Sequence, residues 1–489
     1  MRFKVFAALV ATVALMGAAV AAASATNRSS QATTAQMTTT NQPTATKLEA
    51  AASLVGDDEG TCALLRSGAV ECWGNNTAGA LGDGTVTSIW YSEVPVAAKG
   101  LTGARGLVTD GVAYCALLRS GGVECWGVNT YGALGDDSSE AYSDVPVTVK
   151  GLTGARSLVG DRNGYGDGYG FCAVWGSGGV KCWGSNDALI SGGVEGSGLL
   201  GNGSSGASSD VPVTVKGLAG VKSLASDQAG YCALLKSGEA ECWGDNDYNE
   251  LGDGQLGDLA GSNSSRQVSS SVPVAVKGLT GAASLASDGI GYCALLRSGG
   301  AECWGNNSFG ELGDNSKPNP KTNLGSDVPV TVKGLAGAAS LVSTDYGYCA
   351  LLRSGGAKCW GSNSFDELGH ARSSTSQAYS DVPVTVKGLA GAVSLVGGDD
   401  NGSTGSEYTY CAVLRSFTAM CWGQNGYGEL GDGGSESASD VPVTVKGLAG
   451  VASLEVGIGT ACAVLRNGGA ECWGYVAGTV PVNLAGIGP

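Results

Sequence analysis

The sequence of 489 residues has one histidine, few charged residues (15%) and far fewer basic than acidic side chains. One histidine excludes zinc sites of the His-Glu-x-x-His type, and no Gly-Lys-Ser/Thr element marks a Walker phosphate loop. We assign no catalytic role to this histidine, His370, which lies in a polar stretch. The 28 basic and 44 acidic residues give a net charge of -16. Because nucleic-acid binding depends on neutralising phosphates, this balance predicts no nucleic-acid partner and disfavours an anionic membrane surface.

Glycine, in contrast, is abundant, with 83 residues. The glycines show no three-residue period, which excludes a collagen helix, and a hydrophobic content of 43% excludes a largely disordered chain. Many glycines with few aromatics favour short strands joined by tight turns. We therefore expect one large all-β body rather than the several domains that the length alone would suggest.

The N-terminal region has the pattern of a targeting segment. Residues 1–4 carry two basic side chains, residues 5–23 are apolar, and Ala23-Ser24-Ala25 is a small-residue cleavage signature. Residues 1–25 are therefore predicted to be a secretory signal peptide, with an uncleaved membrane anchor as the alternative. Residues 26–46 are rich in Ser and Thr and predict a disordered linker. After signal cleavage we expect no membrane span, and a protein that is secreted or associated with the cell envelope.

One pattern returns at intervals of 51 to 62 residues through the rest of the chain. Cys-Trp-Gly occurs eight times, from Cys72 to Cys472, and eight Val-Pro-Val elements alternate with it. Eight repeat units therefore fill residues 47–489 and leave no room for a second domain.

Each unit predicts four short strands, which we call A to D in chain order. In the second unit, strand B includes residues 114–119, strand C residues 123–127 and strand D residues 145–149. Gly121 fits the left-handed position of the B–C corner, and Pro146 cannot donate to a ladder, so strand D belongs at an edge. Four-stranded sheets too small to fold alone stack radially, so we predict a β-propeller of eight units. We expect the closing blade to combine residues 53–55 with residues 480–482.

The loop after strand C carries a family resemblance. Residues 132–136 read Gly-Ala-Leu-Gly-Asp, follow Trp126-Gly127 and precede the valine-proline strand. This repeat resembles that of the regulator of chromosome condensation family, including its secreted bacterial branch, which is similar in fold to β-lactamase inhibitory protein II. The resemblance implies a propeller, typically of seven blades, and activities as different as nucleotide exchange and enzyme inhibition. Nucleotide exchange requires an intracellular GTPase, and the signal peptide argues against it.

This sequence departs from the family at the position before the strand B cysteine, where a histidine is common. An aromatic residue stands there instead in most units: Tyr114, Phe171, Tyr231, Tyr292, Tyr348 and Tyr410.

All 16 cysteines fall in pairs ten residues apart. The pairs are Cys62 and Cys72, Cys115 and Cys125, Cys172 and Cys182, Cys232 and Cys242, Cys293 and Cys303, Cys349 and Cys359, Cys411 and Cys421, and Cys462 and Cys472. With the corner centred on Ser120, Cys115 and Cys125 lie directly opposite each other, at a separation that a disulfide accepts. We predict eight disulfides within blades, which an oxidising compartment would preserve. Buried free thiols remain an alternative, and the lack of Cys-x-x-Cys disfavours a metal site.

Strands that alternate in direction sort the connections onto two faces. The A–B and C–D connections form what we call the loop face, and the B–C corners and D–A turns form the corner face. The long segments 161–171, 185–210, 253–271, 314–327 and 397–410 all belong to the loop face. Acidic residues concentrate in these variable loops. Basic residues are predicted to ring the corner face: Arg66, Arg119, Lys150, Lys216, Arg297, Lys333, Arg353, Lys387, Arg415, Lys446 and Arg466.

Variable loops on a rigid scaffold commonly bind ligands, so the loop face is the predicted site. Tolerated insertions are the alternative. The candidate binding residues are Asp161, Asp167, Asp399, Asp400, Glu407, Trp90, Tyr91 and Tyr165. Residues 161–167 and 399–402 resemble calcium loops but lack the twelfth-position glutamate, so ordinary turns compete with calcium as their explanation. No other cofactor is predicted. The loop aromatics Tyr131, Phe309, Phe365 and Tyr427 are expected to pack between blades.

These features predict a monomeric secreted interaction propeller, not an enzyme, whose acidic loop face binds an extracellular protein or an envelope glycan. The alternative is an extracellular enzyme inhibitor resembling β-lactamase inhibitory protein II. A third hypothesis is a lyase or hydrolase that uses loop carboxylates. Aromatic residues at the rim of one face would favour the inhibitor, whereas two close carboxylates with a strongly raised pKa would favour the enzyme.

Overall fold

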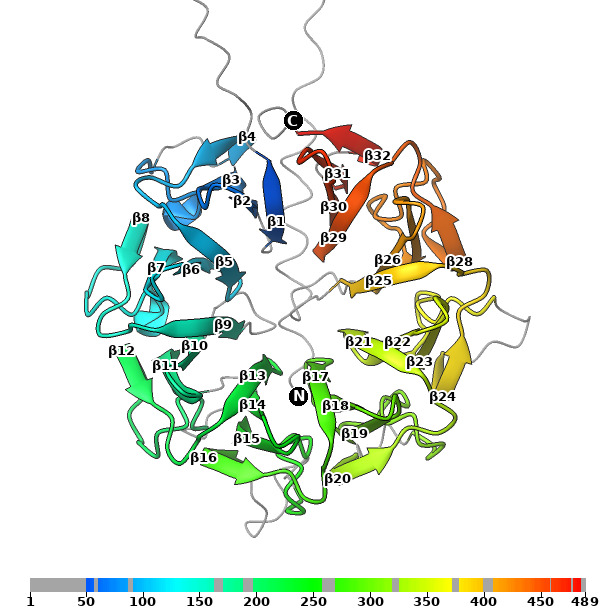
Figure 1. Ribbon diagram of the computed structural model, residues 1–489, viewed down its shortest axis with the longest axis horizontal. Coiled ribbons are helices and arrows are strands. Elements are labelled where there is room, and N and C mark those ends of the chain that lie inside the picture. The colour runs from blue at the N-terminus through cyan, green and yellow to red at the C-terminus, as the bar shows by residue number, and fades with distance from the viewer. Residues whose placement is uncertain are drawn as a thin grey trace, which may run out of the picture. The chain divides into compact units, whose positions relative to one another are not determined.

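A computed structural model describes residues 50–56, 60–86, 91–161, 170–187, 197–256, 269–318, 325–371, 378–398, 408–457, 459–475 and 478–484. The predicted signal peptide and linker lie outside these residues. The body formed by residues 47–489 contains eight four-stranded antiparallel sheets. Figure 1 shows these sheets as blades arranged radially in a ring, with strand A innermost and strand D outermost. The predicted eight-bladed propeller is confirmed.

Each blade consists of four consecutive strands. Blades 1 to 4 are β1 Ala51–Gly56, β2 Gly60–Leu65, β3 Val70–Asn75 and β4 Tyr91–Ala97; β5 Ala104–Thr109, β6 Ala113–Leu118, β7 Val123–Val128 and β8 Tyr142–Thr148; β9 Ala155–Asp161, β10 Gly170–Trp175, β11 Gly179–Ser185 and β12 Ser208–Thr214; and β13 Val221–Ser226, β14 Gly230–Leu235, β15 Ala240–Asp245 and β16 Ser269–Ala275. Blades 5 to 8 are β17 Ala282–Ser287, β18 Gly291–Leu296, β19 Ala301–Gly305 and β20 Ser326–Thr331; β21 Ala338–Thr344, β22 Gly347–Leu352, β23 Ala357–Ser362 and β24 Tyr379–Thr385; β25 Ala392–Gly397, β26 Thr409–Leu414, β27 Ala419–Gln424 and β28 Ala438–Thr444; and β29 Val451–Gly457, β30 Thr460–Leu465, β31 Ala470–Gly474 and β32 Gly478–Asn483. Two short 3-10 helices, η1 Thr77–Gly79 and η2 Thr130–Gly132, lie in C–D loops.

The structure confirms the eight predicted disulfides. Cys115 and Cys125 are register partners on β6 and β7, with Cα atoms 4.1 Å apart. The other seven pairs repeat this arrangement, and no described cysteine is free. Each bridge therefore joins strands B and C of one blade.

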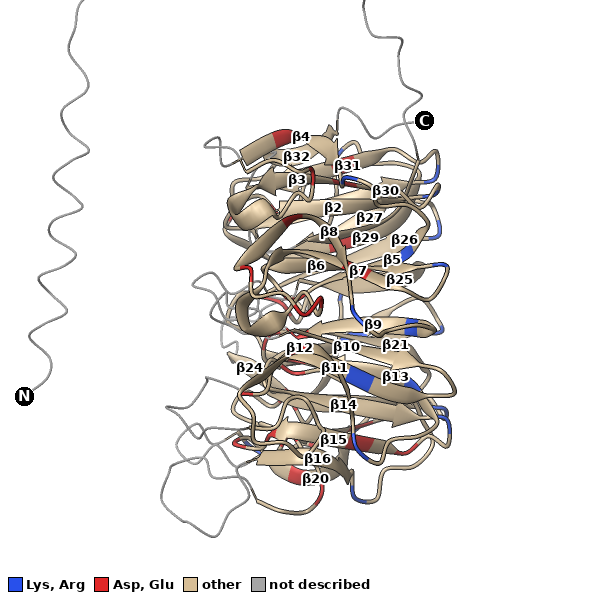
Figure 2. Cartoon of the chain, turned by 90° about the vertical axis from the view of Figure 1, so that its left-hand side faces the viewer, with Lys and Arg blue, Asp and Glu red and all other residues tan. Residues whose placement is uncertain are grey.

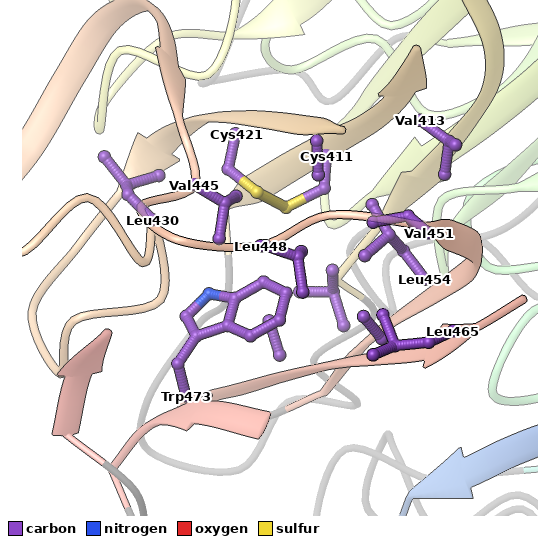
Figure 3. Close-up of a cluster of buried hydrophobic side chains, with 14 residues drawn as sticks. Cys411, Val413, Cys421, Leu430, Val445, Leu448, Val451, Leu454, Leu465 and Trp473 are labelled. Atoms are coloured by element: carbon purple, nitrogen blue, oxygen red, sulfur yellow. A yellow bond between two sulfur atoms is a disulfide. The ribbon is translucent and has the colours of Figure 1, made fainter. Parts of the chain in front are cut away.

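The hydrophobic core lies between neighbouring blades. Figure 3 shows one such cluster, in which the Trp473 ring of blade 8 packs beside the Cys411–Cys421 bridge of blade 7. The aromatic residue before the strand B cysteine stacks on the tryptophan of its own blade, as Tyr114 does on Trp126 with ring centroids 5.8 Å apart. The Cys-Trp-Gly tryptophans are therefore core residues, as expected.

Backbone hydrogen bonds join adjacent blades at the corners. The backbone N–H of the first strand A residue donates to the backbone carbonyl of the third corner residue in the preceding blade, as Ala155 N does to Gly121 O at 2.9 Å. Gly121 has a φ of 83°, and a Cβ there would lie 2.8 Å from the Gly154 Cα. Glycine is thus required by both conformation and space.

The expectation of a mixed closing blade was wrong. Strands β1 to β4 form blade 1 and β29 to β32 form blade 8, each from one continuous segment. The two blades meet by packing and by hydrogen bonds such as Ala51 N to Gly468 O at 3.0 Å. We call this contact between blades 8 and 1 the seam. Because each blade completes its own ladder, no strand exchange is needed to close the ring.

The two faces differ in charge. Figure 2 shows lysines and arginines gathered mainly along the edge formed by the corners and D–A turns. Lys150 departs from this arrangement, because its ammonium pairs with the Asp137 carboxylate of the C–D loop. The side chains of Lys216 and Lys446 also approach their own C–D loops, at Gly203 and Gly433. The assignment of Lys150 to the corner face is therefore corrected, because its long side chain returns toward the loop of its own blade.

Candidate functional site on the loop face

The structure describes two of the eight predicted binding residues. Asp161 ends the inner strand β9, and Tyr91 begins the outer strand β4, so they lie on different blades at opposite sides of their sheets. The Asp161 side chain is 0% exposed, whereas Tyr91 is exposed. The other six lie outside the described residues: Asp167, Asp399, Asp400, Glu407, Trp90 and Tyr165.

Asp161 belongs to a set of buried carboxylates where the inner strands end on the loop face. The same position in blades 2 to 5 is held by Asp110, Asp161, Asp227 and Asp288, all buried. In blade 6 it is held by the buried Thr344, which precedes the buried Asp345. Asp110 Oδ1 accepts a hydrogen bond from Ala113 N at 2.9 Å. These carboxylates therefore help to form the A–B turns at the inner edge of the loop face.

Tyrosines link these carboxylates from blade to blade. The strand B tyrosine of one blade interacts through its hydroxyl with the aspartate of the preceding blade. The pairs are Tyr231 with Asp161, Tyr292 with Asp227, and Tyr348 with Asp288. In the next blade, the Thr344 hydroxyl donates to the Tyr410 hydroxyl at 2.9 Å. We call this arrangement the tyrosine–carboxylate ladder.

Burial makes these carboxyl groups weak acids. Burial, followed by the charges of Asp227 and Asp110, holds the pKa of Asp161 well above its usual range. Burial raises the pKa of Asp227 and of Asp288 to about 7. The neighbouring tyrosine hydroxyls act in the opposite direction, because a donated hydrogen bond favours the ionised form. The carboxyl groups of the ladder thus keep their protons at a pH where exposed carboxylates are ionised.

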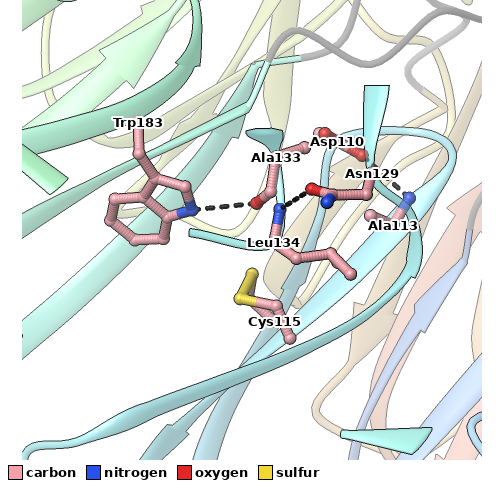
Figure 4. Close-up of a disulfide and its surroundings, with 8 residues drawn as sticks. Asp110, Ala113, Cys115, Asn129, Ala133, Leu134 and Trp183 are labelled. Carbon is pink, nitrogen blue, oxygen red and sulfur yellow. Dashed lines mark hydrogen bonds between the residues drawn. A yellow bond between two sulfur atoms is a disulfide. The ribbon is translucent and has the colours of Figure 1, made fainter. Parts of the chain in front are cut away.

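A buried asparagine organises the C–D loop. In Figure 4, Asn129 Oδ1 accepts a hydrogen bond from Leu134 N at 3.0 Å, and Trp183 Nε1 of the next blade donates to Ala133 O at 2.9 Å. The bond from the loop leucine recurs at Asn76, Asn186, Asn246, Asn307, Asn363 and Asn425. The sequence signal for this role was the fixed asparagine after Trp-Gly-x, which we had not interpreted.

In blades 4 to 7 a buried glutamate fixes an aromatic residue in the same loop. Glu367 Oε2 accepts a hydrogen bond from Phe365 N at 2.7 Å, and Glu429 Oε2 accepts one from Tyr427 N at 2.8 Å. Equivalent bonds join Tyr248 to Glu250 and Phe309 to Glu311. Burial, with a smaller contribution from the Asp288 charge, raises the pKa of Glu311 to about 8. The glutamate therefore sets the backbone position from which the ring projects.

These aromatics contact the following blade and still face solvent. Their ring pairs are Phe309 with Tyr346, Phe365 with Tyr408, and Tyr427 with Tyr475, with centroids 5.3, 4.9 and 5.2 Å apart. We call these six residues the aromatic arc, which spans blades 5 to 8. Packing between blades was expected, but Phe365, Tyr427 and Tyr475 are also 40%, 47% and 73% exposed. Rings held at one edge and open at the other suit contact with a partner.

On the opposite side of the ring, a polar groove of about 450 Å³ lies between blades 2 and 3. Its lining includes Tyr131 of η2, Glu140 and Asp210. Tyr131 has a left-handed backbone with a φ of 58°, an uncommon conformation for an aromatic residue. Sequence reasoning placed Tyr131 between blades and did not recognise the groove.

The described residues contain no group of three or more His, Cys, Asp or Glu side chains arranged to hold a metal ion. The two calcium-like segments fall almost entirely outside the described residues. Among the described residues, no helix is long and apolar enough to cross a membrane.

Fold and site together define an eight-bladed propeller with an aromatic and carboxylate-rich loop face, and comparisons with known proteins show what it resembles. No protein-family model matches the chain. The probable E3 ubiquitin-protein ligase HERC4 of Homo sapiens is 31% identical over 245 residues, which cover 48% of this chain but 20% of HERC4. The mitochondrial RCC1 domain-containing protein RUG3 of Arabidopsis thaliana is 32% identical over 173 residues, 35% of this chain and 36% of RUG3.

Solved structures agree on the fold. Prp20p of Saccharomyces cerevisiae superimposes with a TM-score of 0.54 at 20% identity, covering 77% of this chain and 85% of that one. Yeast RCC1 (Prp20) in its Kap60 complex gives a TM-score of 0.57 at 17% identity, covering 88% and 94%. The chain is thus a β-propeller whose fold resembles that of yeast RCC1 and whose sequence is similar, over part of its length, to HERC4 and to an RCC1 domain-containing protein.

Proposed function

We propose that this propeller is an extracellular binding protein, not an enzyme, and that its loop face binds another protein through the aromatic arc. The observation that carries the proposal is the exposure of three rings: Phe365 and Tyr427, each held by a glutamate bond and by a ring of the next blade, and Tyr475, the ring of blade 8 that contacts Tyr427. Rigid, partly exposed aromatics supply large contact areas with little loss of conformational entropy, and they are enriched at the centres of protein interfaces.

Two further facts support this proposal. The yeast structures concern an RCC1 protein with binding properties toward Gsp1p and histones and a complex with Kap60, so a related propeller binds proteins. Eight disulfides favour an oxidising compartment, consistent with the predicted signal peptide and with a place in the secreted bacterial branch.

The burial of the ladder argues against catalysis. Asp161, Asp227 and Asp288 of the ladder have raised pKa values, and all three are buried. A general acid must come within hydrogen-bonding reach of its substrate. Direct action by these carboxyls would therefore require the A–B turns that cover them to open.

An extracellular enzyme inhibitor is the second candidate, because the aromatic arc lies at the rim of one face. An inhibitor would place the same rings over the entrance of an enzyme's active site. An envelope glycan, which aromatic rings also stack against, is a ligand class that the experiment must separate from protein.

The test is affinity capture from the envelope and culture fluid of the source organism with the purified protein as bait. The Phe365→Ala/Tyr427→Ala/Tyr475→Ala variant should lose the captured partner, while Tyr142→Ala, an equally exposed ring on the outer strand of blade 2, should retain it. Protease treatment of the fluid should abolish capture, whereas capture that survives protease but not glycosidase would identify a glycan. Unchanged capture by the triple variant would contradict the proposed site.

A further inference from the structure

At the corner-face end of the inner strands, the second residue of each strand is exposed or partly exposed, and its chemistry differs between blades 2 to 4 and the other five blades. Blades 2 to 4 carry cations there, namely Arg105, Arg156 and Lys222. The other blades carry short aliphatic side chains at the same position: Ala52, Ala283, Ala339, Val393 and Ala452. One strand position therefore produces a cationic half and an apolar half.

Two of the three cations, Arg105 and Lys222, are held by backbone oxygens rather than by carboxylates. Arg105 Nη2 donates to Ala155 O and Arg156 O at 3.0 and 3.1 Å, and Lys222 Nζ donates to Ala283 O. No described carboxylate lies within 4.0 Å of these cations; the one ion pair between described residues is that of Lys150 with Asp137. Their charges are therefore oriented but not neutralised, and Arg105 Nη1 has no described acceptor.

The adjacent corners add to this charge. The corner residues include Arg119 and Lys236, which are exposed and likewise donate to backbone oxygens, Arg119 Nη2 to Arg66 O at 3.3 Å and Lys236 Nζ to Ser177 O at 3.2 Å. The acidic groups nearest in the repeat are Glu239, which is exposed at the blade 4 corner, and the strand C residues Glu124, Glu241 and Glu302. Partial burial raises the pKa of those three strand C glutamates. Over blades 2 to 4 the cations Arg105, Arg119, Arg156, Lys222 and Lys236 outnumber the acids Glu124, Glu239 and Glu241, so this part of the corner face is cationic.

Blade 7, which lies across the ring from blade 3 (Figure 1), carries exposed apolar side chains. Val393 is 52% exposed, and Phe417 in the blade 7 corner is 43% exposed. Phe417 has a φ of 61° at a position that is glycine in every other blade. The Arg466 guanidinium lies 4.0 Å from its ring centroid. A left-handed backbone at a phenylalanine lowers the stability of the fold by about 1 kcal/mol. We therefore infer that this exposed residue serves binding rather than stability.

We propose that the corner face binds an acidic segment of a protein that lies across the ends of the inner strands. Carboxylates of the segment lie over Arg105, Arg156 and Lys222, and an apolar side chain lies against Val393 and Phe417. A phosphate polymer or an anionic polysaccharide would satisfy the cations but has no apolar side chain for the blade 7 patch. This surface is separate from the loop face, so it does not depend on the function proposed above.

The experiment measures binding of fluorescent peptides to the purified protein by anisotropy. One peptide is all glutamate, a second has the same charge with leucines interspersed, and inorganic polyphosphate serves as a competitor. The leucine-containing peptide should bind tightest, and its affinity should fall as salt is raised, since exposed charges are screened.

Two variants, each of which loses three positive charges, distinguish direct contact between the peptide and the proposed site from the effect of the protein's overall charge. Arg105→Gln/Arg156→Gln/Lys222→Gln should weaken both peptides about tenfold or more, whereas Lys333→Gln/Lys387→Gln/Lys446→Gln, in exposed D–A turns, should change affinity less than about twofold. Equal losses in both variants would overturn the proposed site.

The apolar half is tested by Phe417→Gly, which restores the residue found in the other corners. It should weaken only the leucine-containing peptide, severalfold, while the melting temperature stays constant or rises. Unchanged affinity in this variant, or polyphosphate binding tighter than either peptide, would overturn the assignment to a protein segment.

Discussion

At the scale of single residues, the tyrosine–carboxylate ladder gives the molecule an unusual pH response. Asp227 and Asp288 have a pKa near 7 in the folded protein, above the value of about 4 expected in the unfolded chain. The folded state therefore binds more protons than the unfolded state between these values. The corresponding stability is fully present below about pH 4 and is lost as pH rises through about 7.

We expect Asp227→Asn and Asp288→Asn to reduce this pH dependence. Between pH 5 and 8 each titrating group should lower the free energy of unfolding by at most about 1.4 kcal/mol per pH unit, and the amide, which does not ionise, removes that slope. Urea unfolding across this range measures it. Glu239→Gln, an exposed carboxylate at a corner, should leave the slope unchanged. A wild-type protein whose stability rises from pH 5 to 8 would contradict this account.

Single residues also show what could not be predicted from the sequence, namely which polar side chains are buried. Asp161 was selected as an acidic loop residue, but as the last residue of an inner strand it is buried by the next blade. Composition alone cannot distinguish a loop carboxylate from one that a neighbouring blade covers. Asn129 and Glu367 were not selected at all, because their roles depend on how the C–D loop folds back on itself.

At the scale of the element, the C–D loop depends on its buried asparagine. Asn425 accepts from Leu430 N at 3.0 Å and donates to Glu436 O at 2.8 Å, so Asn425→Ala leaves two backbone groups without partners. Unsatisfied buried groups cost about 1–3 kcal/mol each. We expect chemical denaturation to show a loss of about 2 kcal/mol or more, against less than about 0.5 kcal/mol for exposed Gln255→Ala.

The B–C hairpin is the second element that can be tested. The double variant Cys349→Ala/Cys359→Ala removes one buried bridge that closes a short loop, and it should lower the free energy of unfolding by about 2–3 kcal/mol. Alkylation of the native wild-type protein followed by mass spectrometry should find no free thiol among the described pairs. Recovery of alkylated cysteines, or of bridges between different blades, would contradict the predicted pairing.

Hairpins and disulfides could be predicted because they are local. A constant ten-residue spacing around Ser120 determines which residues face each other on two strands, whatever the rest of the ring does. The aromatic arc could not be predicted in this way. It requires Phe365 of one blade to meet Tyr408 of the next, and their contact depends on the angle between blades.

At the scale of the whole molecule, seven junctions between blades are alike and the seam differs. The strand C tryptophan of each following blade donates to a carbonyl of the preceding C–D loop, as Trp473 does to Glu429 O at 2.6 Å. Trp73 of blade 1 makes no such bond to a described residue, since blade 8 has a much shorter C–D connection without the leucine-glycine motif. The error about the closing blade came from reading this short connection as evidence of strand exchange.

The seam should therefore open first. We expect amide hydrogen exchange to be faster for Ala51, which donates to Gly468 O, than for Ala155, which makes the same bond to Gly121 O at an ordinary junction. Exchange measured peptide by peptide with mass spectrometry checks this order. Equal protection at both junctions would show that packing alone compensates for the missing tryptophan bond.

The continuity of each blade has a consequence for how such rings evolve. Because no strand is borrowed from a distant part of the chain, one uninterrupted stretch of coding sequence, from one strand A to the next, specifies a complete blade with its own disulfide. Unequal recombination within such a gene can add or remove that stretch in a single event, without a matching change at the point of closure. The number of blades is thus a genetically adjustable quantity, and the eight units here differ by one such step from the seven that the family resemblance implied.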